Sequence, residues 1–185
     1  MHDDDVADTR ETGRVRLFSS PETVFAFVAP LVGLLFMLLV PPFQVGDEYN
    51  HFYRAYQVAE GGLVPQRRGT TVGGPLPAGL VDLTKAFPQS MEWHRARRQD
   101  RWQVLRRAAA IELQADERPF THFPNTSLYT PVCYLPQAIG IGLGRLLRVR
   151  PLWLFYLARL GNLAAFVLLG YAALRLAPVF KWHLF

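Results

Sequence analysis

Three blocks of apolar residues constrain the fold of this chain most strongly. They occupy residues 23–40, 128–147 and 151–176, and each is close to the roughly 20 apolar residues that cross about 30 Å of hydrocarbon. Half of the 185 residues are hydrophobic, and they are concentrated in these blocks instead of recurring along one face of amphipathic helices. The sequence therefore predicts an all-α membrane protein with three transmembrane helices.

The first block, residues 23–40, is predicted to be an uncleaved membrane anchor. It is longer than the apolar core of a typical signal peptide, and no small-x-small cleavage site follows it at residues 41–43. Cleavage as a secretory signal is the alternative. Arginines in the preceding tail, residues 1–22, place the N-terminus in the cytoplasm by the positive-inside rule. We therefore expect a multi-pass protein of the plasma (inner) membrane, with residues 41–127 as an extracytoplasmic loop domain.

The later arginines agree with this expected topology. Arg145, Arg148 and Arg150 lie just before the third block, where they are expected to mark a cytoplasmic turn between the second and third spans. Residues 177–185 would then form a short extracytoplasmic end.

The formal net charge of +5 does not indicate a nucleic-acid-binding protein. The arginines lie beside the apolar blocks and in one intervening segment, and they do not form a basic surface with base-stacking aromatic residues. Cys133 is the only cysteine, so the chain cannot form an internal disulfide. We interpret the positive charge as a feature of a membrane protein.

A helix is predicted near residues 46–60, directly after the first apolar block. Asp47, His51 and Arg54 are spaced i, i+4 and i+7 and would share one face of this helix. Asp47 is a suitable N-cap or first-turn acid, and Gly61 a suitable stop. The opposite face carries four aromatic residues: Tyr49, Phe52, Tyr53 and Tyr56. The helix is therefore expected to present polar chemistry on one side while the other side packs against protein or lipid headgroups.

The pattern Asp47-Glu48-x-x-His51 can support two kinds of chemistry. A carboxylate and a histidine can bind a divalent cation whose other ligands are phosphate oxygens, or they can act as a general base. The pattern lacks the first histidine of zinc peptidases and the partner carboxylates of di-iron bundles. Two acids in a first turn also stabilise a helix without any catalysis. The residues alone leave these alternatives open.

A second surface helix is predicted over residues 90–117, which contain strong helix formers and no Gly or Pro. Arginines that include Arg98 and Arg101 alternate there with Trp93 and Trp102. This composition indicates either a dock for lipid phosphates or a solvated basic helix with two anchoring tryptophans. The preceding segment, residues 62–79, is rich in Pro and Gly and is expected to be an irregular loop.

The second and third apolar blocks carry polar residues at membrane depth. Pro131, Pro136 and Gln137 interrupt the second block, as in spans that line a cavity or another helix. Gly140 and Gly144 form a small-residue face that could contact a partner membrane protein. In the third block, the side chain of Arg159 either reaches the headgroups or pairs with a carboxylate or a lipid phosphate.

Three motifs resemble the domain-of-unknown-function family 2142, a family of predicted polytopic membrane proteins of bacteria. They are Pro41-Pro42-Phe43-Gln44-x-Gly46-Asp47-Glu48-x-x-His51-Phe52-x-Arg54-Ala55-Tyr56, Tyr129-x-Pro131-x-x-Tyr134-Leu-Pro136-Gln137-Ala138-x-Gly140 and Ala158-Arg159-Leu160-x-Asn162. That family in turn resembles the C-fold glycosyltransferases, which use polyprenyl-phosphate sugars outside the cytoplasm. The resemblance implies that Asp47 is a catalytic base or metal partner, with Glu48 as the alternative.

The leading hypothesis is therefore the N-terminal part of a lipid-dependent glycosyltransferase for cell-envelope glycans. Asp47 would deprotonate the acceptor or hold a divalent cation with His51, and His51 and Arg54 would contact the donor phosphate. Arg98, Arg101, Gln137 and Arg159 are further candidates for binding the lipid-linked substrate. Enzymes of this kind have more spans than this chain, which is why we expect it to be a piece of a longer protein. The alternatives are a non-catalytic membrane subunit and a truncated fragment without activity of its own.

Overall fold

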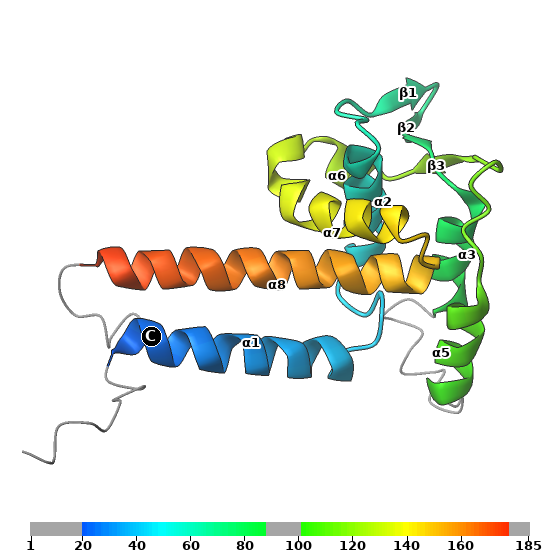
Figure 1. Cartoon of the computed structure of the whole chain (residues 1–185). Helices are drawn as coiled ribbons and strands as arrows, with labels where there is room; N and C mark the ends of the chain where they lie inside the picture. Colours follow the sequence, from blue (N-terminus) through cyan, green and yellow to red (C-terminus); the bar gives the residue numbers. More distant parts are fainter. Residues whose placement is uncertain (1–19, 88–100, 178–185) are drawn as a thin grey trace, which may run out of the picture.

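Two long helices run antiparallel, and most of the remaining described chain is gathered at one end of the pair (Figure 1). The structure is a computed structural model that describes residues 20–87 and 101–177. Its helices are α1 (Pro21–Leu39), α2 (Glu48–Ala59), α3 (Ala78–Ala86), α5 (Arg101–Ala110), α6 (Pro124–Ser127), the 3₁₀ helix η1 (Pro131–Tyr134), α7 (Leu135–Leu146) and α8 (Pro151–Leu176). Its strands are β1 (Gln66–Arg68), β2 (Thr71–Pro75) and β3 (Phe120–His122).

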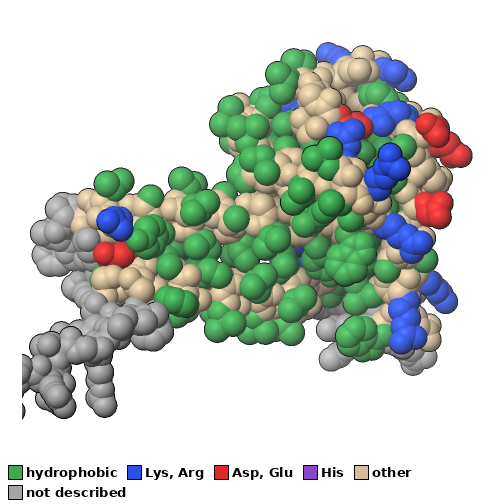
Figure 2. All heavy atoms as spheres, in the orientation of Figure 1, with side chains coloured by type: hydrophobic (Ala, Val, Ile, Leu, Met, Phe, Trp, Pro, Cys, Tyr) green, Lys and Arg blue, Asp and Glu red, His purple; other side chains and the backbone are tan. Residues whose placement is uncertain are grey.

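The two long helices, α1 and α8, are the candidate membrane spans. They contain 19 and 26 residues, and an 18-residue stretch of each has a mean hydropathy of 2.2 and 1.7, respectively. At 1.5 Å per residue the two helices are about 28 and 39 Å long. They pack closely where Gly33 of α1 meets Leu163 and where Gly170 of α8 meets Phe25. On the face shown in Figure 2, apolar side chains cover both helices, whereas most of the visible charged side chains lie on the rest of the molecule.

The described part of the chain between these helices, residues 41–87 and 101–150, forms a folded unit that we call the head. Its central element is α2, in which every residue from Phe52 to Val58 is buried. The first turns of α8 enter the same core through Leu152, Leu154 and Phe155. The helix expected near residues 46–60 is therefore present, but it is a core helix and not a surface helix, because α7 and α8 cover the side that the sequence left open.

The head contains a small antiparallel sheet with the strand order β1-β2-β3, so the fold is mostly but not entirely helical. Residues 62–79 were expected to be irregular, and that expectation is wrong. A turn at Gly69 (φ 59°) connects β1 to β2. At Gly73, a Cβ atom would lie 1.9 Å from the carbonyl oxygen of Thr121 in β3. Glycine at this position therefore permits β2 to pair with β3, which lies about 50 residues later in the sequence. Local composition does not reveal a pairing between such distant segments.

The basic helix expected over residues 90–117 ends earlier in the structure. Residues 90–100 lie outside the described residues, and α5 stops at Ala110. The carbonyl groups of the chain beyond it accept hydrogen bonds from the first residues of α3: Ala78 N–H donates to Glu117 O at 2.7 Å, and Gly79 N–H donates to Leu113 O at 3.1 Å. After Ala110, these long-range hydrogen bonds take the place of the hydrogen bonds that would continue α5. The tertiary contacts thus outweigh the helix propensity of residues 111–117.

The second of the three expected spans, residues 128–147, is not a membrane-crossing helix in this structure. It is divided between η1 and α7, and the 12 residues of α7 are only about 18 Å long. Its C-terminal end is tied to α2, because Arg145 pairs with Glu60 at 3.3 Å and donates to Ala59 O at 3.1 Å. Arg145 therefore belongs to the same folded unit as residues 41–87 and 101–127.

Gly140 and Gly144, which were expected to contact a partner protein, instead face α8 of the same chain. A Cβ atom at Gly140 would lie 2.1 Å from the carbonyl oxygen of Leu157, and one at Gly144 would lie 2.6 Å from a methyl group of Leu154. Gly142, on the same helix, has no atom within 4 Å of its Cβ position. The small-residue pattern therefore serves an internal helix hairpin.

This difference between neighbouring glycines predicts opposite effects of the same substitution. Gly140→Ala places a methyl group against backbone that cannot rotate away, and should lower the free energy of unfolding by about 1–3 kcal/mol. Gly142→Ala should raise it by about 0.5–1 kcal/mol, because alanine favours helix more than glycine does. Melting temperatures of the detergent-solubilised chain test both. Equal effects of the two substitutions would contradict the α7–α8 packing.

Candidate functional site: a polar cluster where the head meets the long helices

A polar cluster lies where the start of α2 meets α1 and α8. We define this junction cluster as Asp47, Glu48, His51, Gln137 and Arg159. Four of these residues, all except Asp47, line one small cavity of about 60 Å³. The junction cluster unites most of the site residues that the sequence predicted, although they come from three separate segments of the chain.

Arg159 and Glu48 form a clamp that joins three elements. The Nε and Nη2 atoms of Arg159 lie 2.8 and 2.9 Å from the two carboxylate oxygens of Glu48. The same guanidinium donates to the carbonyl groups that end α1, including Val40 O at 2.8 Å, with longer bonds to Met37 O and Pro41 O. Glu48 also accepts a hydrogen bond from Phe43 N–H at 2.8 Å. Of the possibilities left open for Arg159, the structure therefore shows pairing with a carboxylate.

Asp47 is placed differently from its neighbour. It is exposed and occupies the N-cap position in the left-handed region (φ 58°), which aspartate tolerates better than most residues. Its carboxylate does not cap the helix. It instead accepts long hydrogen bonds of 3.3–3.4 Å from the side-chain amides of Asn50 and Asn125. Of the two adjacent carboxylates, Glu48 is held by an arginine, whereas Asp47 is accessible from solvent.

His51 is oriented by Tyr134, whose phenol oxygen lies 3.0 Å from the histidine Nδ1 atom. Burial raises the pKa of Tyr134 to about 12, although the nearby Arg54 acts in the opposite direction. The phenol is therefore protonated at neutral pH and can donate to Nδ1. When the phenol donates in this bond, the neutral imidazole carries its ring proton on Nε2. Tyr129 stacks on the same imidazole at a ring-centroid distance of 6.0 Å.

Gln137 contributes an unsatisfied polar atom to the junction cluster. Its Oε1 atom is buried and has no hydrogen-bond partner among the residues that the structure describes. It lines the small cavity together with His51 and Asn162. The sequence predicted that this proline-containing segment lines a cavity, and Gln137 does so here. Buried hydrogen-bond acceptors without a partner are rare in proteins, so the unpaired Oε1 atom of Gln137 marks this cavity as unusual.

Arg54 does not share an exposed face with Asp47 and His51. Its side chain is only 1% exposed, and it donates to Gln57 Oε1 at 2.6 Å and to the carbonyl oxygens of Gly62 and Leu63 at 3.0 and 2.7 Å. Burial lowers the pKa of the guanidinium from its ordinary value. In this structure Arg54 thus secures the loop after α2, while Asp47 and His51 remain near the junction.

The remaining predicted site residues lie elsewhere. Arg98 is outside the described residues, and of Arg101 only the backbone, at the start of α5, is described. Within residues 20–87 and 101–177, no three His, Cys, Asp or Glu side chains are grouped as a metal site. A divalent cation at Asp47 and His51 would therefore need ligands from a substrate.

Comparison with known proteins identifies the family. A family model described as a predicted membrane protein, DUF2142, matches residues 30–185. The chain belongs to the DUF2142 family. No curated protein and no solved structure showed a significant match to it. The match covers all of α8, residues 30–39 of α1 and the whole junction cluster of this DUF2142 chain.

Two residues of the DUF2142 site were not singled out from the sequence as functional. Asn125 contacts the carboxylate of Asp47, and Tyr134 orients His51. Tyr134 lies within one of the motifs that resemble the family, so the resemblance was an available indication. Asn125 lies outside those motifs, and its contact with Asp47, 78 positions earlier in the sequence, depends on the fold.

Proposed function

We propose that this DUF2142 chain supplies the acid–base site of an enzyme that transfers a sugar from a polyprenyl-phosphate carrier. The single observation that carries the proposal is the separation of two adjacent carboxylates at the head end of the candidate spans. Glu48 is neutralised by Arg159, whereas Asp47 is exposed and has only long amide contacts. A general base must be reachable by its substrate, and the exposed carboxylate of Asp47 meets this requirement.

The depth of the junction cluster supports a lipid-linked substrate. Arg159 contacts the carbonyl groups at the end of α1, so the cluster lies where that apolar helix stops. The phosphate of a lipid carrier lies at the same level, between hydrocarbon and water. Asp47 would accept the proton of the acceptor hydroxyl, and His51 would donate from Nε2 to the phosphate or a sugar oxygen. In the alternative form of the proposal, Asp47 and an unprotonated Nε2 of His51 would hold a divalent cation together with phosphate oxygens, in place of the hydrogen bond from Nε2.

The orientation is also proposed. With α1 and α8 as the two spans, both outer ends of this hairpin lie in the cytoplasm, in agreement with the arginines of residues 1–22, and the head lies outside. An apolar groove of about 260 Å³ between the end of α1, α5 and α8 supports a role for α5 in holding the lipid carrier. It is lined by Leu38, Leu39, Pro41, Phe87, Trp102, Val104, Leu105 and Tyr156. Arg98, Arg101 and Gln137 remain candidates for contacts with the carrier phosphate.

A transfer assay tests the proposal. Membranes from cells that express the intact gene product are incubated with polyprenyl-phosphate carrying a radiolabelled sugar, and label in the glycan fraction is measured. Membranes from cells lacking the protein are the control. We expect transfer only when the protein is present. Equal labelling in both membranes, across a panel of polyprenyl-phosphate sugars, would count against it.

A second candidate function, a non-catalytic membrane subunit, is favoured by one exposed apolar stripe. It runs along η1 and α7 at helical spacing and consists of Leu128, Val132, Leu135, Ile139, Leu143 and Leu146, which are between 47% and 91% exposed. This stripe is on the side of α7 away from Gly140 and Gly144 and can contact lipid or another membrane helix. Absence of transfer, together with a protein crosslinked through this stripe, would support the second candidate.

A further inference from the structure

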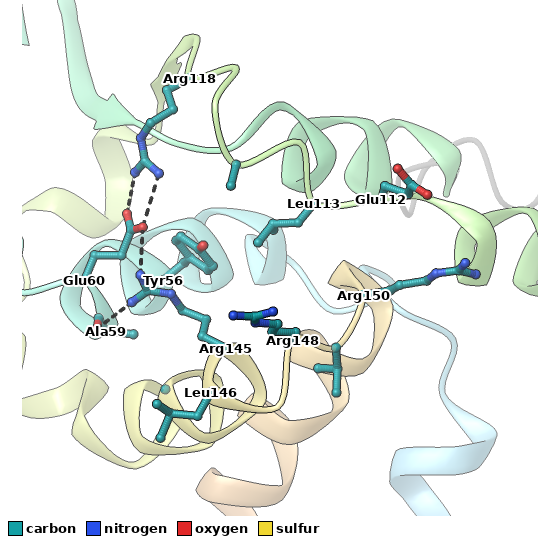
Figure 3. A pocket seen from close by; sticks show the side chains of 13 residues that line it. Tyr56, Ala59, Glu60, Glu112, Leu113, Arg118, Arg145, Leu146, Arg148 and Arg150 are labelled. Atoms are coloured by element: carbon teal, nitrogen blue, oxygen red, sulfur yellow. Dashed lines mark hydrogen bonds and ion pairs between the residues drawn. The ribbon is translucent and has the colours of Figure 1, made fainter.

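A cleft rich in arginine lies at the other end of α2 from the junction cluster. Its volume is about 860 Å³, and Figure 3 shows its side chains from the C-terminal ends of α2 and α7, from the turn before α8 and from the segment after α5. We call it the arginine cleft and define it by its four arginines. These are Arg118, Arg145, Arg148 and Arg150, with Glu60 and Glu112 also in the lining. The lining thus has an excess of two positive charges.

Two of these arginines are fixed by Glu60. Arg118 donates to Glu60 Oε1 at 3.2 Å, and Arg145 pairs with the same oxygen at 3.3 Å. The guanidinium of Arg145 also lies over the ring of Tyr56, at 5.5 Å from its centroid. Because three separate segments converge on one carboxylate, this wall of the arginine cleft is held in place before any ligand arrives.

Arg148 is held differently. Its side chain is exposed and has no hydrogen bond or ion pair with any residue that the structure describes, while its backbone N–H donates to Arg145 O at 3.0 Å and its φ of 52° is in the left-handed region. In Figure 3 its side chain extends into the space between Arg145 and Arg150. Arg150 donates to Ala109 O at 3.1 Å. A cationic side chain that is placed among other arginines without an anionic partner produces a strong attraction for an anion.

We propose that the arginine cleft binds a phosphate group, with Arg148 as its main ligand. The planar guanidinium binds phosphate through two parallel hydrogen bonds, and the excess of two positive charges matches a phosphate monoester dianion. This proposal does not rest on the proposed glycosyl transfer, since none of the cleft residues belongs to the junction cluster.

The phosphate could be carried by a soluble molecule or by a lipid headgroup. Arg150 lies directly before the first residue of α8, and Arg159 lies within α8, nine residues later. Nine residues correspond to about 14 Å along the helix axis. The arginine cleft is thus displaced toward water from the level at which α1 ends. The two sources share one recognition chemistry, and separate binding experiments distinguish them.

The test measures binding of inorganic pyrophosphate to the full chain in detergent by isothermal titration calorimetry. Arg148→Ala should weaken binding at least about tenfold, because a charge-assisted contact is lost, and Arg148→Lys should weaken it less. Arg67→Ala is the matched control, since it removes one exposed arginine of β1 outside the cleft. Both Arg148 variants should keep the wild-type melting temperature, because the Arg148 side chain has no partner among the described residues to lose, and Arg67→Ala removes only one exposed hydrogen bond, to Gly69 O.

A second arm uses nanodiscs that contain either phosphatidic acid or only phosphatidylcholine. Binding that depends on Arg148 with pyrophosphate supports the proposal and indicates a soluble ligand. Dependence on Arg148 only in phosphatidic acid nanodiscs supports it and indicates a lipid headgroup. No binding in either arm, or equal affinity for wild type, Arg148→Ala and Arg67→Ala, would overturn it.

Discussion

Replacing Arg159 with methionine is expected to lower the free energy of unfolding by about 3–5 kcal/mol, as when one partner of a buried ion pair is removed. The pair is largely shielded, since the side chains of Arg159 and Glu48 are only 15% and 18% exposed. Loss of the guanidinium would leave the carboxylate of Glu48 without its counter-ion and the carbonyl groups at the end of α1 without donors. The change should therefore loosen α1 from the head and weaken the whole junction cluster.

A double-mutant cycle tests this role of Arg159. Unfolding of the detergent-solubilised chain in increasing dodecyl sulfate is compared for wild type, Arg159→Met, Glu48→Gln and the double variant. The double variant should be more stable than Arg159→Met, because it no longer buries an unpaired charge. Additive losses of stability in the two single variants would show that the ion pair is not coupled, and the clamp would be rejected.

The second large effect is expected for activity. Asp47→Asn should reduce sugar transfer by about 10²–10⁴-fold, the usual contribution of a general base. Its melting temperature should remain close to wild type, since the exposed carboxylate makes only amide contacts longer than 3.2 Å. The assay is the transfer of labelled sugar in membranes, with protein levels measured by immunoblot.

Glu48→Gln provides the matched control at the adjacent position. It should lower stability and activity together, because Glu48 acts through the clamp with Arg159, whereas Asp47→Asn should lower activity alone. This contrast separates a catalytic carboxylate from a structural one. Unchanged transfer by both Asp47→Ala and Glu48→Ala would eliminate the proposed chemistry.

Several parts of the fold were predictable because their causes are local. The apolar runs of α1 and α8 are visible in composition alone, and Gly61 (φ 85°) stops α2 where the sequence indicated. Asp47 and His51 are one helical turn apart, and the backbone N–H of His51 donates to Asp47 O at 3.1 Å, as that spacing predicts. Whether Asp47 is catalytic remains a prediction.

Other parts depended on contacts between distant segments. The sheet forms because Gly73 lets β2 approach β3, and α5 ends at Ala110 because the following carbonyl groups bond near α3. The expected span at 128–147 is instead part of a helix hairpin that packs into the head. Its apolar composition suits both a span and a helix packed on α8, and tertiary contacts such as the ion pair between Arg145 and Glu60 and the close approach of Gly140 to Leu157 distinguish them.

The sequence by itself therefore determined which segments are apolar enough to cross a membrane and which side chains could do chemistry beside them. Only the tertiary structure decided what each of those side chains does. Glu48 and Asp47 are chemically similar and adjacent, yet Arg159, 111 positions away, neutralises the first and leaves the second exposed. The reason is physical: the state of a carboxylate depends on the charges and donors within a few ångströms of it, and those neighbours are set by the fold.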